Sequence, residues 1–329
     1  MRTLLTTFAA NIDKKILNMN QRILILLLAL TLIASCSKDS ELLQSAPQTE
    51  NTSDSDLVPV RFFGSNITVD ISEQSRPVTR ATGTSFDTND EIGITVVNFT
   101  NTNSTEIKSK NYADNICYKY NGTEFIPATD KLISQYEKDE CRQHLIFYAV
   151  YPYIADLTPN YTFSIKENQT SHHDYTTSDL SFQKIETEDL SVNFSFTHLL
   201  GRMDIKLVGD GSPSLTLKTS VKLINVYNSV DLNLNATTGE QLVSTNESKG
   251  DVVCNDANDL FNRKQRHFQA IIAPQQISNE TKLQVTVGSL TAECYFPDEL
   301  QAKHIGSNRQ LSITARVSII ADQLHVAIQ

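Results

Sequence analysis

Tryptophan is missing from all 329 residues, although the chain holds 11 tyrosines and 14 phenylalanines. Aromatic platforms that stack against sugars usually include tryptophan, so its absence argues modestly against a dedicated carbohydrate module. Positive charge is also scarce: 28 Lys and Arg stand against 38 Asp and Glu, a formal net charge of −10. Because an acidic chain repels phosphate backbones, we expect no nucleic acid among its partners.

Catalytic and cofactor-binding motifs are absent as well. The sequence has no G-x-S-x-G, H-E-x-x-H or C-x-x-C motif and no glycine-rich phosphate loop, although nucleophiles, metals and phosphates are usually held in such local patterns. The adjacent histidines of His172 to Asp174 are more typical of a solvated loop than of a metal site. The polar residues from Asp87 to Glu91 are explained by a turn before a strand rather than by calcium. We expect no enzyme, no cofactor and no metal.

Two further groups of polar residues are explained by structural or solvated roles rather than by a functional site. His198 lies on the same side of a predicted strand as Phe194 and Phe196, which favours a hydrogen-bonded structural histidine over a catalytic base. The one basic cluster is typical of a solvated loop, with an anionic partner site as the alternative. Its members are Arg263, Lys264, Arg266 and His267.

One long apolar run, Ile23 to Ile33, lies near the N-terminus and is followed by Ala34-Ser35-Cys36. It is shorter than the about 20 apolar residues that a membrane span needs. A preceding positive charge and the small residues after it are typical of a secretory signal, so we assign residues 1–35 to a signal peptide, with Met19 as a candidate true start. The ending resembles the lipobox of bacterial lipoproteins, which implies that the mature chain begins at an acylated Cys36.

Four more cysteines follow Cys36, and an exported protein can oxidise them. They fall two to each predicted domain, so among the three connectivities we favour Cys117 with Cys141 and Cys254 with Cys294. The alternative is four free, partly buried thiols. Cys294 alternates with apolar neighbours, as a small core side chain would.

Many short runs that alternate polar and apolar residues follow residues 36–56, a polar stretch predicted to be a flexible tether. A period of two is expected of a strand with one buried face. With polar turns between the runs and no long helical period, the pattern predicts an all-β fold of two sandwich domains, at 57–198 and 199–329. The predicted strands include Ile67–Ile71, Ile92–Val96, Val192–Phe196, Val221–Val226, Phe268–Ala273, Leu283–Val287, Leu311–Ile319 and Leu324–Ile328.

Two local patterns are more specific. Asn121-Gly122 joins two strand-like segments and tolerates the positive φ angles of a type I′ turn, which predicts a tight hairpin. Leu145 to Val150 is continuously apolar and predicts a central strand covered on both faces. Pro152 is expected to end that strand, because proline cannot donate a hydrogen bond to a neighbour.

Six short motifs occur along the chain in this order: Thr79-Arg80-Ala81-Thr82, Asn89-Asp90-Glu91-Ile92-Gly93-Ile94, Tyr118-x-Tyr120-x-Gly122-x-x-Phe125-x-Pro127, Phe147-Tyr148-Ala149-x-Tyr151-Pro152-Tyr153, Phe194-x-Phe196-x-His198-Leu199-Leu200 and Ile272-x-Pro274-Gln275. Each motif is weak singly, but their order and spacing resemble those of the fimbrillin family of Bacteroidales, the lipoprotein precursors of surface pili and their relatives. The resemblance covers most of the mature chain. It implies two tandem transthyretin-like β-sandwich domains, a lipid anchor in the outer membrane and assembly into adhesive surface fimbriae.

The resemblance also implies a mechanism. In the family, a trypsin-like protease cuts after an arginine and releases the lipidated N-terminal strand, and a strand of the next subunit fills the groove left behind. Here the strand predicted at Ile67–Ile71 would be lost. Arg61 precedes that strand and Arg76 is followed by proline, which leaves Arg80 and a processed form starting at Ala81. The alternative is that Arg80 is an ordinary loop arginine.

The end of the chain departs from the family pattern. Many relatives finish in a strand that contains an aromatic residue, often tryptophan, whereas this chain stops at Val326-Ala327-Ile328-Gln329. Residues 311–329 either donate a strand to a neighbour or complete their own sandwich. We therefore keep three roles: a fimbrial subunit that exchanges strands with other subunits, a fimbrial anchor, and a non-polymerising lipoprotein that binds a glycan or host ligand.

Overall fold

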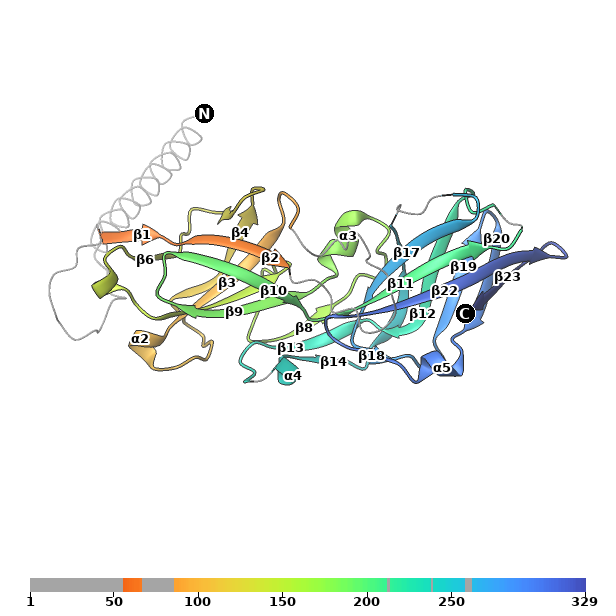
Figure 1. Ribbon diagram of the computed structural model, residues 1–329. Helices are drawn as coiled ribbons and strands as arrows, with labels where there is room; N and C mark the ends of the chain where they lie inside the picture. The colour runs from red at the N-terminus through yellow and green to blue at the C-terminus, as the bar shows by residue number, and fades with distance from the viewer. Residues whose placement is uncertain (1–55, 67–85, 212–213, 238, 258–261) are drawn as a thin grey trace, which may run out of the picture. The chain divides into compact units, whose positions relative to one another are not determined.

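The structure is a computed structural model and describes residues 56–66, 86–211, 214–237, 239–257 and 262–329. Regular structure in these ranges is mostly β-strand (Figure 1), which confirms the all-β prediction. No helix of these ranges is long and apolar enough to cross a membrane. The short helices are α2 (Phe99–Thr102), η2 (Asp139–Cys141), α3 (His172–Thr177), α4 (Gly239–Leu242) and α5 (Asp298–Gln301).

A closed barrel contains most strands of the first half of the described chain. The barrel encloses one hydrophobic core that is rich in phenylalanine, because alternate residues of each strand point inward. In barrel order the strands are β10 (Ser191–His198), β2 (Arg61–Asn66), β5 (Phe125–Pro127), β4 (Ala113–Tyr120), β3 (Glu91–Asn98), β7 (Leu145–Tyr151) and β9 (Ser181–Thr187).

Strand β7 is the predicted central strand, and all seven of its residues are buried. It pairs with β3 on one side and β9 on the other. Phe147 and Ala149 pack into the barrel core, whereas Ile146 and Tyr148 pack into a second core on the outside of the barrel wall. Because both faces are covered, no position of the strand is polar. It ends one residue before Pro152, as expected.

The hairpin predicted at Asn121-Gly122 is present, since β4 pairs with β5 on either side of it. Its turn is not of type I′. Only Gly122 has a positive φ, of 101°, and Tyr120 pairs with Phe125 across a four-residue loop. The Asn121 side-chain oxygen accepts the backbone N–H groups of the two residues before Phe125, each at 2.9 Å, and this side-chain turn replaces the tight backbone turn.

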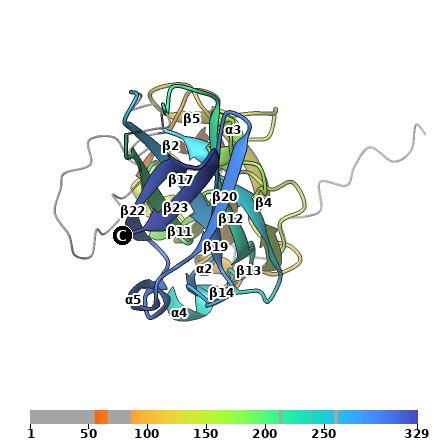
Figure 2. The ribbon, with the colours of Figure 1, turned by 90° about the vertical axis from the view of Figure 1, so that its right-hand side faces the viewer.

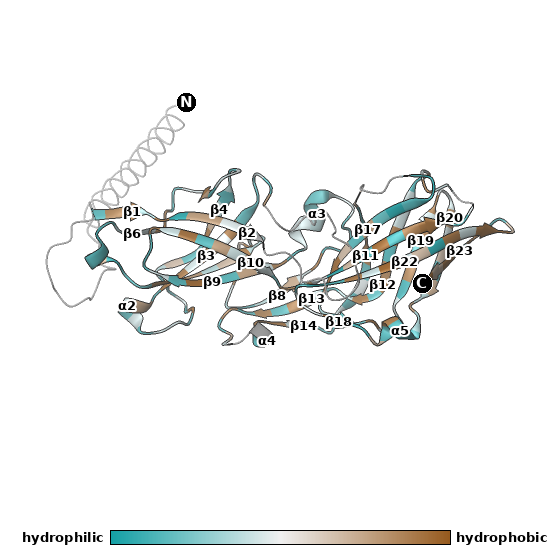
Figure 3. Ribbon diagram, viewed as in Figure 1, coloured by the Kyte–Doolittle hydropathy of each residue, from teal (hydrophilic) through white to brown (hydrophobic). Residues whose placement is uncertain are grey.

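Two further sheets share one large core in the second half of the chain (Figure 2). Coloured by hydropathy, their strands show apolar and polar residues in alternation (Figure 3). One sheet has the order β16 (Asn255–Asp256), β17 (Gln265–Ile272), β11 (Gly201–Gly209), β22 (Arg309–Ile320) and β23 (Gln323–Ile328). The other has the order β15 (Lys249–Val253), β12 (Thr219–Tyr227), β19 (Lys282–Val287) and β20 (Leu290–Tyr295).

Part of the basic cluster lies inside this half rather than in a solvated loop. Arg266 and His267 belong to β17 and are 8% and 9% exposed. Arg266 forms an ion pair with Asp256, and the His267 Nε2 atom lies 3.8 Å from a carboxylate oxygen of Asp204. The solvated-loop prediction is therefore wrong for these two residues, because carboxylates on neighbouring strands compensate their burial. It holds for Arg263 and Lys264, which are exposed.

Smaller sheets complete the fold. The three-stranded sheet β14 (Val243–Thr245), β13 (Ser229–Asn233) and β8 (Asn160–Ser164) joins segments from both sides of residue 198. The second core likewise contains residues from both sides, and the domain boundary at 198/199 stays a prediction. The two-stranded sheets are β1 (Leu57–Pro59) with β6 (Ser134–Tyr136), and β18 (Gln275–Gln276) with β21 (His304–Ile305).

Candidate functional site

Strand β2 is the earliest strand of the barrel and is held mainly from one side. It runs parallel to β10, with six residue pairs from Arg61 opposite Ser191 to Asn66 opposite Phe196. On its other side, one residue pair, Phe62 with Phe125, connects it to β5. A parallel pair needs a long crossover, and here that crossover includes the rest of the barrel. Strand β2 therefore closes the barrel without a hairpin partner.

Phe62 anchors this strand in the barrel core. Its side chain is completely buried. The centroid of its ring lies 4.9 Å from that of Tyr118 in an edge-to-face contact, and 5.7 Å from those of Phe147 and Phe194. Aromatic pairs at such spacing stabilise a core beyond their burial alone. The two flanking residues differ: Arg61 is exposed and Phe63 is partly buried, as a strand with one inward face requires.

The segment before Phe62 continues the same contacts. The backbone N–H of Val60, whose side chain is 4% exposed, donates to the Ile133 carbonyl at 2.9 Å. The N–H of Ile133 donates in turn to the Tyr118 hydroxyl at 3.0 Å, and burial raises the pKa of that phenol above its usual value. Strand β1 pairs with β6 beyond this point. Residues 57–66 are therefore a continuous N-terminal segment laid along the barrel.

Electrostatic contacts add little to this attachment. The Arg61 Nε atom donates to the Glu124 carboxylate at 2.9 Å, but 60% of the arginine side chain is exposed. Hydrogen bonding to Glu124 raises the pKa of Arg61. Solvent screens an ion pair that is this exposed, so it contributes little to stability. The apolar contacts of Phe62 thus dominate the attachment of β2.

Removal of β2 would leave an apolar groove with unpaired backbone groups. Without β2, the backbone groups of β10 that face it would lose their partners, and Phe194 and Phe125 would be bared to water. Both effects favour capture of another extended segment, because main-chain pairing supplies affinity and side-chain pockets supply register. The part of the chain that the structure describes contains no cluster of three or more His, Cys, Asp or Glu that could hold a metal.

The structure describes only part of the region in which the sequence predicts a removable strand. The predicted strand Ile67–Ile71 lies outside the described residues, as do Cys36, Arg80 and Ala81. Strand β2, which fills the barrel, was not predicted from the sequence. Arg61, which precedes the predicted strand Ile67–Ile71, is the first residue of β2. The alternation of Val58, Val60 and Phe62 was the signal that could have found it.

His198 and His172 each have a carboxylate partner. The Nδ1 atom of His198 lies 2.8 Å from an Asp179 carboxylate oxygen and 3.3 Å from the Ser181 hydroxyl, so this buried histidine is a hydrogen-bonded structural residue. The Nε2 atom of His172 lies 2.6 Å from an Asp87 carboxylate oxygen. The turn at Asp87 to Glu91 is also present, since the Asp90 N–H donates to the Asp87 carbonyl at 2.9 Å.

Comparison with protein families identifies the chain. A family model described as fimbrillin-like matches residues 79–324, which is most of the sequence. The chain belongs to the fimbrillin-like family. A comparison with curated proteins found no match.

Solved structures of similar fold agree with this family. This fimbrillin-like chain resembles a candidate cell adhesion protein from Bacteroides ovatus with a TM-score of 0.57 and 17% identity, over 83% of this chain and 96% of that one. A candidate cell adhesion protein from Bacteroides uniformis gives a TM-score of 0.55 and 17% identity, with 82% and 96% covered. A third, from Bacteroides fragilis, gives 0.53 and 11% identity, with 83% and 97% covered. At these identities the likeness concerns the fold.

The four cysteines of the fimbrillin-like region are free thiols in the structure. The pairing of Cys254 with Cys294 is not formed. Cys254 follows β15 and its N–H donates to the Val221 carbonyl on β12, whereas Cys294 lies on β20, two strands beyond β12. Three strand spacings of about 4.8 Å separate these edges, far more than a disulfide spans. The alternative of free thiols agrees with the structure, which also leaves Cys117 and Cys141 unpaired.

Proposed function

We propose that this protein is a cell-surface fimbrial subunit that is assembled by strand replacement and takes part in adhesion. In the precursor, residues 57–66 occupy the barrel groove. Cleavage after Arg80 releases that segment, and a strand of a neighbouring subunit takes the place of β2. The single observation that carries this proposal is the position of β2: the strand lies on the N-terminal side of Arg80, yet it buries Phe62 completely in the barrel core.

The way β2 is attached supports its replacement. It pairs along its length only with β10 and is joined to β5 by one residue pair, so leaving requires no hairpin to open. The lost contacts are an apolar side chain and a row of backbone hydrogen bonds, and any extended segment with a suitably spaced apolar residue offers both. Cleavage favours replacement of β2, because the released segment loses the high effective concentration that its covalent tether gave it at the groove.

The finer assignments belong to the same proposal. Residues 1–35 are the signal peptide, Cys36 carries the lipid that holds the precursor in the outer membrane, and residues 36–56 are the tether. The barrel of the first half and the two sheets of the second half correspond in this proposal to two transthyretin-like domains, at 57–198 and 199–329. Arg61 is set aside as the cleavage site because a cut there would leave β2 in place.

A second role, that of a fimbrial anchor or a non-polymerising binding lipoprotein, is favoured by the C-terminus. Strand β23 pairs antiparallel with β22 over six residues, from Ile328 opposite Ala315 to Gln323 opposite Ile320. The terminal residues thus complete their own sheet. A subunit whose last strand stays in its own sheet receives a neighbour's strand but does not donate this one.

The test is the N-terminus of the native protein in membrane-bound and mechanically sheared fractions, read by mass spectrometry. We expect a lipidated Cys36 form in the membrane and an Ala81 form in sheared fibres. Arg80→Ala removes the Ala81 form and the fibres, whereas the matched variant Arg76→Ala, in front of Pro77, leaves both unchanged. Fibres built from chains that still carry residues 57–66 would contradict strand replacement. A lipidated form with no sheared material would favour the anchor role.

A further inference from the structure

A cavity of about 600 Å³ lies at the edge of strand β8, away from the groove of β2. One wall is four consecutive residues of β8, Tyr161 to Ser164, followed by Lys166. The end of β7 and the residues after it, Tyr151 to Ile154, also line the cavity, as do Asn89 to Glu91 and the α3 residue His173. Consecutive residues line a cavity only when it runs along the edge of a strand, because the two faces of a strand take alternate residues.

The backbone at this edge has no neighbouring strand in the described part of the chain, although the Lys166 N–H donates to the Ser178 hydroxyl and the Asn160 carbonyl accepts from the Thr158 hydroxyl. In its sheet β8 is the last strand, and no described strand pairs with it on the side away from β13. The Ile165 N–H donates to the Asn228 carbonyl at 2.8 Å, and the Pro159 carbonyl accepts from the Leu234 N–H at 2.7 Å. Odd-numbered residues therefore bond to β13 in this antiparallel pair. The N–H and C=O groups of the even-numbered residues Thr162 and Ser164 point to the other side, along the cavity.

The two ends of the cavity differ in polarity. At the start of β8, Tyr161 packs against the second core, as does the lining residue Ile154, so this end is mainly apolar and aromatic. At the other end, five residues along the strand and about 17 Å away, Lys166 makes no ion pair with a described residue. An occupant that lies along β8 thus meets an apolar pocket first and an uncompensated cation last.

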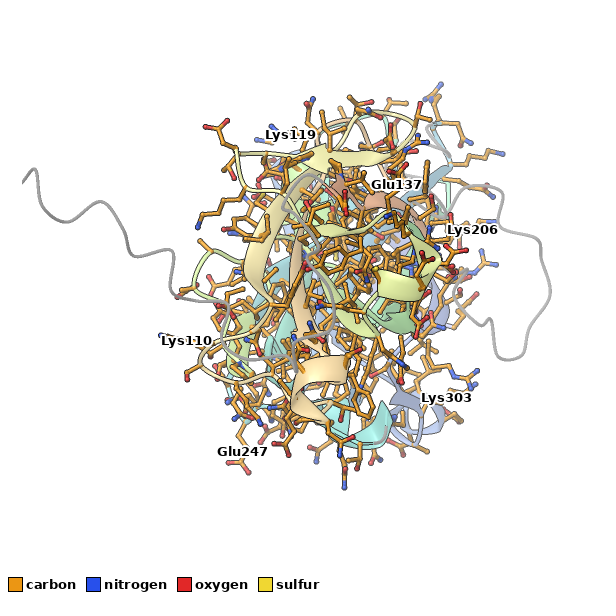
Figure 4. All side chains as sticks on the ribbon, turned by 90° about the vertical axis from the view of Figure 1, so that its left-hand side faces the viewer. Lys110, Lys119, Glu137, Lys206, Glu247 and Lys303 are labelled. Atoms are coloured by element: carbon orange, nitrogen blue, oxygen red, sulfur yellow. The ribbon has the colours of Figure 1, made fainter. Side chains whose placement is uncertain are left out.

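The carboxylates near Lys166 already have partners. The two oxygens of Asp90 accept from the backbone N–H of Asp87 at 2.8 Å and from the Tyr151 hydroxyl at 3.4 Å. Glu91 forms an ion pair with Lys119 at 3.2 Å, a lysine that lies at the periphery of the molecule in Figure 4. Neither carboxylate forms an ion pair with Lys166, so Lys166 remains open to an acidic group of an occupant, while Asp90 keeps its own negative charge.

We propose that this cavity binds an extended peptide segment of about five residues, which adds to the edge of β8 as a further strand. An apolar or aromatic side chain fills the end at Tyr161 and Ile154, and an acidic side chain pairs with Lys166. The volume falls within the range of about 300 to 1,000 Å³ that is usual for ligand pockets, and strand addition is a recurring mode of peptide recognition. The site does not depend on cleavage at Arg80, since no residue of β1 or β2 lines it.

The geometry offers a substitution that separates backbone pairing from other contacts. The Ser164 N–H points into the cavity and not toward β13, so Ser164→Pro removes a donor to the occupant while the pairing with β13 is kept. Proline is tolerated on an edge strand at such a position, and the preceding residue, Phe163, is already extended as proline requires. Ser164→Ala is the matched control, because it removes the side chain and keeps the N–H.

The test pans a random heptapeptide library displayed on phage against the intact uncleaved chain, and measures the Kd of the best synthetic peptides by fluorescence polarisation. We expect enriched sequences with Asp or Glu at one end and an apolar or aromatic residue at the other. Ser164→Pro should weaken them at least tenfold, Ser164→Ala by less than threefold, and Lys166→Glu at least fivefold. Thermal melts establish that each variant is folded.

A second measurement leaves the protein unchanged, in case Ser164→Pro does not fold. N-methylation of single peptide bonds of the best peptide should cost at least tenfold at alternate positions only, because a strand bonds to its neighbour through alternate residues. Absence of enrichment over an unrelated protein overturns the proposal. Equal peptide affinity of the folded Ser164→Pro and Ser164→Ala variants also overturns it. A saccharide that binds this cavity with the same affinity in the Ser164→Pro variant overturns it too, because such a ligand is held by side chains.

Discussion

Truncation of Phe62 tests the groove most directly, because the attachment of β2 depends on this one side chain. A buried phenylalanine cut to alanine usually costs about 3 to 5 kcal/mol of unfolding free energy. Phe62 is completely buried and its ring contacts three other aromatic rings. The edge-to-face contact with Tyr118 adds about 0.5 to 1.5 kcal/mol beyond burial. We therefore expect Phe62→Ala to cost about 4 kcal/mol in the uncleaved chain.

The next residue provides the matched control. Phe63 is partly buried, and its ring centroid lies 5.0 Å from the Arg61 guanidinium carbon. A cation–π contact at an exposed site is worth about 0.5 to 1 kcal/mol, so Phe63→Ala should cost about 1 kcal/mol. Urea unfolding followed by near-ultraviolet circular dichroism measures both variants, and their difference of about 3 kcal/mol appears as a shift of the midpoint with little change of slope.

Strand replacement makes the same difference visible in another assay. After cleavage at Arg80, the N-terminal fragment is held only by its contacts in the groove. A loss of about 3 kcal/mol corresponds to about 150-fold weaker retention of the fragment, which dissociation from immobilised nicked protein can measure. If Phe62→Ala costs no more than Phe63→Ala in unfolding, or releases the fragment no faster, the reasoning that places the attachment in the aromatic core is refuted.

Three further predictions concern other parts of the fold. Asp204→Ala leaves the buried guanidinium of Arg202 without its carboxylate partner on β11. We expect the free energy of unfolding in urea to fall by about 3 to 5 kcal/mol. A loss below about 1 kcal/mol would show that the ion pair contributes little. Gly122→Ala should lower the free energy of unfolding by about 1 to 2 kcal/mol, because a φ of 101° is unfavourable for alanine. Its nearest neighbour, Thr88, leaves space for the added methyl group. An unchanged midpoint of urea unfolding would contradict this. Burial raises the pKa of the Cys254 thiol to about 12. At pH 8 this thiol should therefore resist a disulfide reagent in the folded chain and react once urea unfolds the chain. Rapid labelling of Cys254 in the native protein would contradict its burial.

Local sequence determined the elements whose environment is uniform along their length. The alternation of Val192, Phe194 and Phe196 predicted β10 because one face of that strand is buried and the other is solvated. The unbroken apolar run from Leu145 predicted β7 because both faces of that strand are covered, by two different cores. The order and spacing of such motifs were also sufficient to recognise the family.

Tertiary structure decided what depends on residues that are distant in the sequence. Strand β2 is short and contains a glycine, and its identity as the barrel strand comes from a parallel partner, β10, much later in the chain. By sequence alone, Arg266 and His267 resemble a solvated cluster. The fold places Asp256 beside Arg266 and Asp204 beside His267, and these carboxylates compensate the free-energy cost of burying the two side chains. The cavity at β8 needs four separate segments and a missing strand neighbour. Periodicity reports the burial of a residue within its own strand, whereas pairing partners and cavities are properties of contacts between strands, which no local pattern encodes.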